Sequence, residues 1–82
     1  MKKHKEEKIK ALEYEIISEF ARIRRTQKIS SQQLSKESGI IRNTINRIEN
    51  HKQSPQMNTI LNLLEKLDCT FEIVPLNEKN IN

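Results

Sequence analysis

Apolar residues recur at intervals of three and four positions over most of this chain, which places them on one face of a helix. The first such stretch predicts a helix at about residues 8–27, and its apolar positions are Leu12, Ile16, Ile17, Phe20, Ala21 and Ile23. Ser30 followed by Gln33 has the order of an N-cap and a capping box, which predicts a second helix at about residues 31–38. Gly39, the only glycine, ends that helix because glycine adopts a positive φ without steric cost.

Two further helices follow with the same periodicity. The third is predicted at about residues 42–50, and the fourth at about residues 57–67, after a loop that contains Pro55. The second and third helices share an inward stripe, which comprises Leu34, Gly39, Ile40, Ile45 and Ile48. The fourth helix has one apolar face with two flanking leucines: Met57, Ile60, Leu64 and Leu67, then Leu61 and Leu63.

A different pattern begins after the fourth helix. Residues 70–74 contain β-branched and aromatic side chains, with Phe71 and Ile73 on one side, and they end before Pro75, which predicts a short strand. A lone strand leaves its backbone groups unpaired. We therefore expect Phe71, Ile73 and Val74 to pair with a second copy of the chain in a homodimer.

These elements predict a mainly all-α fold, a bundle of four helices with one C-terminal β-strand. A charged lead-in (residues 1–10) precedes the domain (residues 11–75), and a tail (residues 76–82) follows it. The whole chain has 82 residues, of which 34% are hydrophobic, so it forms one small core and dimerisation is a reasonable way to gain stability.

Composition narrows the class of protein. A single cysteine, Cys69, excludes a disulfide framework within the chain and favours a reduced, cytoplasmic setting. No apolar run approaches the roughly 20 residues of a membrane span, and the basic start, MKKHKEEKIK, precedes no secretory apolar stretch, so no membrane partner is expected. No phosphate-binding loop and no metal-ligand spacing is present, so we expect neither catalysis nor a cofactor.

Charge is distributed unevenly along the chain. The net charge is +4, but residues 1–56 carry 13 Lys and Arg against seven Asp and Glu, and residues 57–82 carry two against four. Basic side chains bind nucleic acid by releasing counterions from its phosphates. The basic part also contains Ile29–Asn50, two short predicted helices joined by a tight turn, the arrangement of a helix-turn-helix with a recognition helix for the DNA major groove.

Residues from about 20 to 67 resemble the Cro/repressor-type (XRE-like) helix-turn-helix domain, which has a lambda-repressor-like fold. The resemblance rests on ISSQQLSKESGI, RNTINRIEN and the final helix after Pro55. It implies that Arg42, Asn43 and Arg47 touch base edges, with Asn46 near the same face. Arg can donate two hydrogen bonds to guanine, and Asn can pair with adenine. A solvated polar face is the alternative interpretation of these residues.

The resemblance also assigns supporting roles. Arg24 and Glu49 match an ion pair that ties the first helix to the end of the third in relatives. The candidate phosphate ligands are Ser31, Gln32, Thr44 and Lys52. Ser30 is expected to be the cap alone. The lysines of the lead-in, Lys2, Lys3, Lys5, Lys8 and Lys10, form either an arm toward DNA or a solvated face.

Two residues depart from the family pattern at the ends of the recognition helix. Ile41 stands where the family usually has Ser or Thr, and isoleucine neither caps a helix nor binds a phosphate. His51 stands where the family prefers Gly, although His tolerates a positive φ better than most residues.

The segments EYEII and FEIVPL on either side of the motif narrow the resemblance to antitoxins of RelE-like toxin–antitoxin pairs, whose partner is a small, basic, RNA-cleaving toxin. The sequence therefore predicts a DNA-binding repressor of its own operator that also silences a toxin. A stand-alone repressor of a phage or mobile element is the alternative.

Overall fold

The structure, a computed structural model, describes residues 2–79. It contains four main helices: α1 Lys2–Thr26, α2 Ser31–Ser38, α3 Arg42–Glu49 and α4 Met57–Lys66. These confirm the four predicted helices, although α1 begins in the lead-in and not near residue 8. The side chains of Lys2, Lys3 and Lys5 lie outside the described part of the chain, as do residues 80–82 of the predicted tail.

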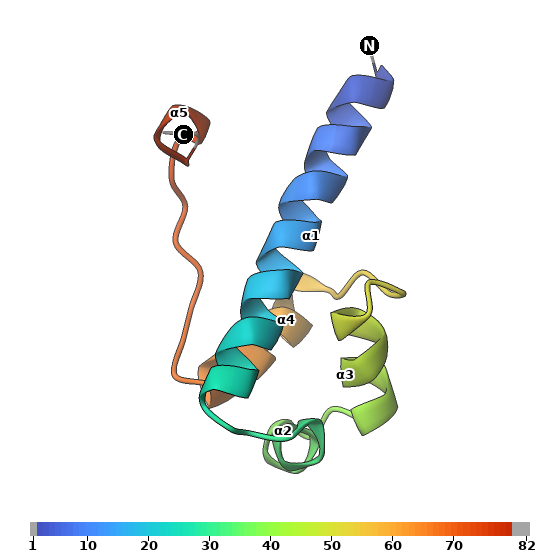
Figure 1. The fold of residues 1–82 in the computed structure, drawn as a ribbon, viewed down its shortest axis with the longest axis vertical. Coiled ribbons are helices and arrows are strands. Elements are labelled where there is room, and N and C mark those ends of the chain that lie inside the picture. Colours follow the sequence, from blue (N-terminus) through green and yellow to red (C-terminus); the bar gives the residue numbers. More distant parts are fainter. Residues whose placement is uncertain (1, 80–82) are drawn as a thin grey trace.

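The helices form an elongated molecule because α1 is much longer than the others (Figure 1). Its 25 residues span about 37 Å at 1.5 Å per residue. Only its C-terminal half packs against the other helices, and its N-terminal half extends beyond them (Figure 1). α2 lies across the C-terminal end of α1, and α3 lies beside α1, so the two short helices share one end of the molecule.

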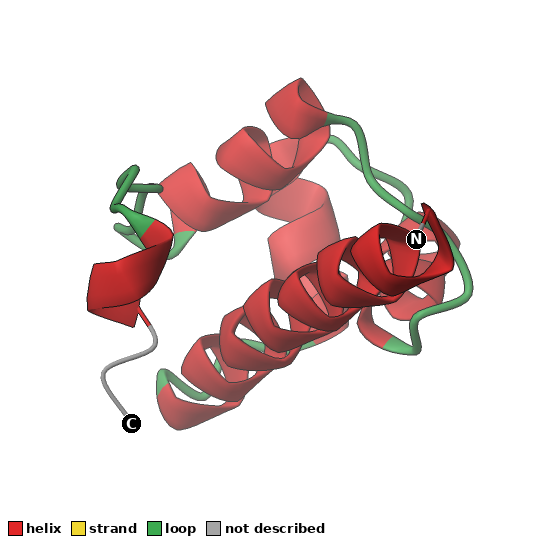
Figure 2. Cartoon of the chain, turned by 90° about the horizontal axis from the view of Figure 1, so that it is seen from above, coloured by secondary structure: helices red, strands yellow, loops and turns green. Residues whose placement is uncertain are grey.

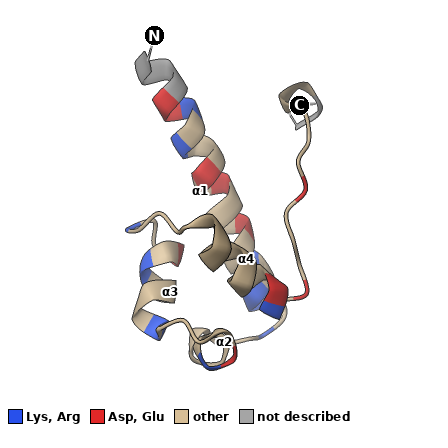
Figure 3. Cartoon of the chain, turned by 180° about the vertical axis from the view of Figure 1, so that it is seen from behind, with Lys and Arg blue, Asp and Glu red and all other residues tan. Residues whose placement is uncertain are grey.

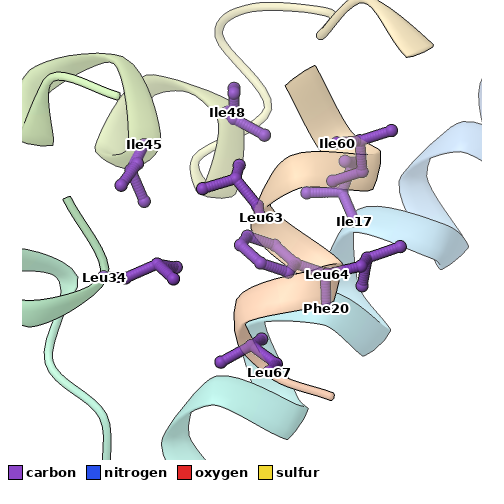
Figure 4. Packing of buried hydrophobic residues seen from close by; sticks show 9 residues of the cluster. All are labelled: Ile17, Phe20, Leu34, Ile45, Ile48, Ile60, Leu63, Leu64 and Leu67. Carbon is purple, nitrogen blue, oxygen red and sulfur yellow. The ribbon is translucent and has the colours of Figure 1, made fainter. Parts of the chain in front are cut away.

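All four helices contribute to one core (Figure 4). Its members are Ile17, Phe20, Leu34, Ile45, Ile48, Ile60, Leu63, Leu64 and Leu67. The predicted inner face of α4 is partly wrong, since Leu63 is fully buried whereas Met57 is 65% exposed. The apolar face of α4 is wider than a single stripe because this helix contacts α2 and also packs its leucines beside Phe20 of α1. Gly39, which we predicted to face inward, is exposed.

Three of the helices are followed by a residue in the left-handed conformation that is not glycine. Lys28, His51 and Asp68 have φ values of 60°, 60° and 65°. In each case the N–H of this left-handed residue and the N–H of the next residue bond back to the helix, as in a Schellman motif. After α3, His51 N–H donates to Ile48 O at 3.0 Å and Lys52 N–H donates to Arg47 O at 2.8 Å. The last turns are therefore closed, but with residues that carry a Cβ penalty.

The predicted C-terminal strand is wrong for the single chain. Residues 69–75 have no regular secondary structure, and none of the residues the structure describes forms a strand (Figure 2). A strand needs a neighbouring edge for its hydrogen bonds, and a bundle of helices offers none. The predicted alternation is wrong too, because Phe71 packs against the core whereas Ile73 is 99% exposed. One helical turn, α5 Leu76–Lys79, lies where we expected only a tail.

No helix within residues 2–79 is both long enough and apolar enough to cross a membrane. Cys69 is half-buried and a free thiol, and its Sγ lies 3.5 Å from Leu67 O. Among the described side chains, no group of three His, Cys, Asp or Glu residues is arranged to hold a metal ion.

Candidate nucleic-acid interface

Hydrogen bonds from the backbone of α2, from two serines of α2 and from a side chain of α4 fix the turn between α2 and α3. Gly39 has φ 78° and its N–H donates to Ser35 O at 2.9 Å. Ile40 is held through both backbone groups, because Ser35 Oγ donates to its carbonyl (2.5 Å) and Ser38 Oγ accepts from its N–H (3.1 Å). Asn62 of α4 donates to Ser38 O at 3.0 Å. Sequence reasoning identified Gly39 but missed the two serines, whose only sequence signal is a small polar residue beside a turn. It also missed Asn62, which reaches the turn from the middle of α4 and has no local signal at all.

The outward face of α3 is polar. Ile45 and Ile48 are completely buried, which fixes the rotation of the helix about its axis. At about 100° per residue, the four predicted base-reading residues then lie within an arc of about 140° on the opposite side. They are Arg42, Asn43, Asn46 and Arg47, of which Asn46 is half-buried and the others are exposed. The structure thus brings these four together on one surface.

The only acidic residue of α3 is turned away from this surface. Glu49 accepts two hydrogen bonds from Arg24 of α1, from Nε at 2.7 Å and from Nη2 at 2.8 Å. Both side chains are largely buried, with 13% of Arg24 and 11% of Glu49 exposed. The hydrogen bond to Glu49 raises the pKa of Arg24 above its ordinary value. The charge that α3 presents to solvent is therefore basic, whereas α1, α2 and α4 each carry both acidic and basic residues (Figure 3).

The predicted phosphate ligands belong to α2, to α3 and to the loop after α3. Ser31 and Gln32 form the first turn of α2, where Ser30 is the N-cap and its Oγ accepts from Gln33 N–H at 3.0 Å. In a full capping box the Gln33 side chain would also bond back to Ser30 N–H. Here the Gln33 side-chain amide donates to Glu37 instead. Thr44 is half-buried on α3, and Lys52 is exposed in the following loop. These candidate ligands therefore come from three separate segments.

The two departures from the family pattern have visible consequences. Ile41 occupies the N-cap of α3, makes no side-chain hydrogen bond there and is 70% exposed. His51 occupies the left-handed position after α3, and its ring stacks on Tyr14 of α1 with centroids 3.8 Å apart and planes 11° apart. The stack joins the loop to α1.

The loop after α3 has two further side-chain contacts that the sequence did not indicate. Ser54 donates a hydrogen bond to the Glu13 carboxylate of α1. Gln53 Oε1 accepts from Arg47 Nε at 3.2 Å, so one base-reading candidate is bonded to this loop. Both contacts join residues that are six or more positions apart, and no local sequence pattern signals them.

A family model described as Helix-turn-helix matches residues 20–74 of the chain, a range that contains α2, α3, α4 and the end of α1. The chain belongs to this helix-turn-helix family. It is also 42% identical, over 65 residues, to an uncharacterized HTH-type transcriptional regulator of Haemophilus influenzae. The match covers 79% of this chain and 66% of the relative, so the chain spans somewhat less than two thirds of that protein. No solved structure matches this chain. The helix-turn-helix resemblance is confirmed, and neither match singles out antitoxins.

Proposed function

We propose that this helix-turn-helix protein is a transcriptional regulator that binds a specific DNA operator through α3. The observation that carries the proposal is the outward arc of α3, where two arginines and two asparagines face solvent and the only acidic residue of the helix is turned inward. The name of the Haemophilus relative, a transcriptional regulator, supports the same role. α3 would enter the major groove with its N-terminal residues nearest the base edges.

Each side chain of the arc has a chemical counterpart on DNA. Arg42 and Arg47 would donate to guanine O6 and N7, and Asn43 and Asn46 would pair with adenine N6 and N7. Ser31, Gln32, Thr44 and Lys52 would bind phosphates on either side, with the free amides at the start of α2 adding to the contacts. Binding should weaken steeply as salt rises, because phosphate contacts release counterions.

The first test is a gel-shift assay on the DNA just upstream of the gene, followed by substitutions. Arg42→Ala is expected to weaken specific binding by about 1–3 kcal/mol and to reduce the preference at one base pair. Arg22→Ala is the matched control, because Arg22 is an exposed arginine of α1 that is paired with Glu19. If Arg42→Ala and Asn43→Ala both leave affinity and selectivity at the control level, α3 does not contact the bases.

We also propose that the protein binds as a homodimer, which would place two copies of α3 about one helical turn of DNA apart. Support comes from the exposed apolar residues of the C-terminal segment: Ile73 is 99% exposed, Leu76 51% and Val74 44%. Phe71 attaches this segment to the core, and residues 69–75 have no regular secondary structure, so a second copy would supply an edge for their backbone groups. Ile73→Asp is then expected to give a monomer in analytical ultracentrifugation, with Thr70→Asp as the exposed control in the same segment.

A second proposed role is that of an antitoxin that also represses its own promoter. It rests first on the resemblance of the segments EYEII and FEIVPL to antitoxins. It rests also on the apolar surface between α1 and α4, whose edges carry Glu13 and Glu19 and would suit a basic partner. Co-expression with the product of a short neighbouring gene tests it. Relief of that product's toxicity supports the antitoxin role, and no relief leaves a stand-alone repressor.

A further inference from the structure

Arg47 is held by the following loop at both its backbone and its side chain. Its carbonyl accepts from the N–H of Lys52 at 2.8 Å, and its Nε donates to the Oε1 of Gln53 at 3.2 Å. Arg42, at the other end of the arc, is exposed and makes no side-chain hydrogen bond to the part of the chain that is described. The two arginines of the arc therefore differ in how much of their orientation is fixed before DNA arrives.

The loop that holds Arg47 is itself attached to α1 on both sides of Gln53. On one side the His51 ring stacks on Tyr14, and on the other Ser54 donates to Glu13. Gln53 lies between these two attachments, so its position is set by α1 and not by the loop alone. α1 in turn packs its Ile17 and Phe20 into the core.

The hydrogen bond to Gln53 leaves the base-binding part of Arg47 free. A guanidinium has five N–H donors in one plane, and the bond at Nε uses one of them. The two terminal nitrogens remain available for a bidentate contact with guanine O6 and N7. Because the acceptor at Nε restricts the plane of the group, fewer side-chain conformations are lost when a base is bound.

We propose that Gln53 is a positioning residue that sets the specificity of the base pair read by Arg47. The proposal rests on the proposed function, since it requires α3 to contact bases. Gln53 touches no base itself; it acts by restricting the guanidinium plane of Arg47. Arg42, which has no such support, tolerates more variation at its own base pair.

The test uses the full chain in a selection from randomised DNA, with the base preference scored at each position. Gln53→Met keeps the size of the side chain but removes the acceptor. It is expected to reduce the preference at the Arg47 position by about two- to tenfold, with the other positions unchanged. Gln53→Glu keeps an acceptor oxygen, so it should retain that preference while lowering overall affinity through its negative charge. Gln56→Met is the matched control, because Gln56 is an exposed glutamine of the same loop whose side chain makes no cap hydrogen bond.

Arg47→Ala identifies which position Arg47 reads, and it separates the two ways of failing. If Arg47→Ala changes the preference at no position, the base-reading role of Arg47 in the proposed function is wrong. If Arg47→Ala abolishes the preference at one position but Gln53→Met leaves it intact, Gln53 does not position Arg47. A loss spread evenly over all positions in Gln53→Met, or an equal loss in Gln53→Glu, also overturns the proposal.

Discussion

The two helices of the helix-turn-helix have the same length but differ in how their ends are stabilised. α2 has a serine N-cap that accepts a backbone N–H and a glycine in the left-handed position after it. α3 has an isoleucine that makes no cap hydrogen bond and a histidine at φ 60°. Local sequence therefore stabilises both ends of α2, whereas α3 has no side-chain cap at its start and is attached to α1 at its end, through Glu49 and the ring of His51. The helix that presents the candidate base-reading residues is thus attached to α1, the longest helix of the molecule.

The largest expected effect comes from breaking the main contact between α3 and α1. Arg24→Ala removes both bonds to Glu49 and the bond from Arg24 Nη1 to Ile29 O (2.8 Å), and it leaves a largely buried carboxylate without its cation. We expect a loss of about 3 kcal/mol in the free energy of unfolding, measured with urea. Arg22→Ala, which breaks an exposed pair with Glu19, should cost far less, because solvent screens that pair. Equal losses for the two variants would contradict the dependence of α3 on this contact.

The cost of Arg24→Ala should also be independent of pH on the alkaline side. Glu49 raises the pKa of Arg24, chiefly through the hydrogen bond, so the folded state holds this proton more tightly than the unfolded state does. A raised pKa contributes stability that is fully present below the unfolded value and is lost only as pH rises through the folded one. For a guanidinium that range lies above any practical assay, so repeating the urea titration at pH 7 and pH 9 should give the same difference between wild type and variant.

This contrast also marks how far the sequence alone predicts the molecule. The caps of α2 were predicted because each acts within a few residues of its own helix end: Ser30 accepts from Gln33 N–H, and Gly39 N–H donates to Ser35 O. The ring stack of Tyr14 on His51 and the bond from Arg47 to Gln53 were not predicted, because they depend on how the loop after α3 folds back on its neighbours. The strand at residues 70–74 was wrong for a related reason, since β-branched residues favour extended backbone but only a neighbouring edge makes it a strand.

The next largest effect concerns the glycine end of α2. A Cβ added at Gly39 meets nothing within 4 Å, so Gly39→Ala tests the backbone conformation alone. We expect a loss of about 1–2 kcal/mol, because alanine is strained at φ 78°. Gly39→Asn should lose less, since asparagine adopts the left-handed region more readily. A larger loss for asparagine would show that the side chain, and not φ, limits this position.

Capping α3 should stabilise it by a similar but smaller amount. Ile41→Ser places a hydroxyl where it can accept an N–H of the first turn, and little apolar burial is lost because Ile41 is 70% exposed. We expect a gain of about 1 kcal/mol in urea unfolding, and Ser30→Ala at the start of α2 should cost about the same. A gain for Ile41→Ser without tighter operator binding would indicate that the serine acts as a cap only and binds no phosphate.

The smallest net effect is expected at the end of α3, where two contributions oppose each other. His51→Gly relieves the left-handed strain at φ 60°, which favours the variant by about 1 kcal/mol, but it removes the stack on Tyr14, which disfavours it by about 0.5–1.5 kcal/mol. The net change in the free energy of unfolding should therefore lie near zero.

Lys28→Gly is the control for His51→Gly. Lys28 also has φ 60° but makes no aromatic contact, so this variant should show the full gain. In a Tyr14→Ala background His51→Gly should become stabilising, because the stack is already lost. If it remains neutral there, the left-handed position after α3 is not strained and the two helices of the motif differ only at their N-terminal ends.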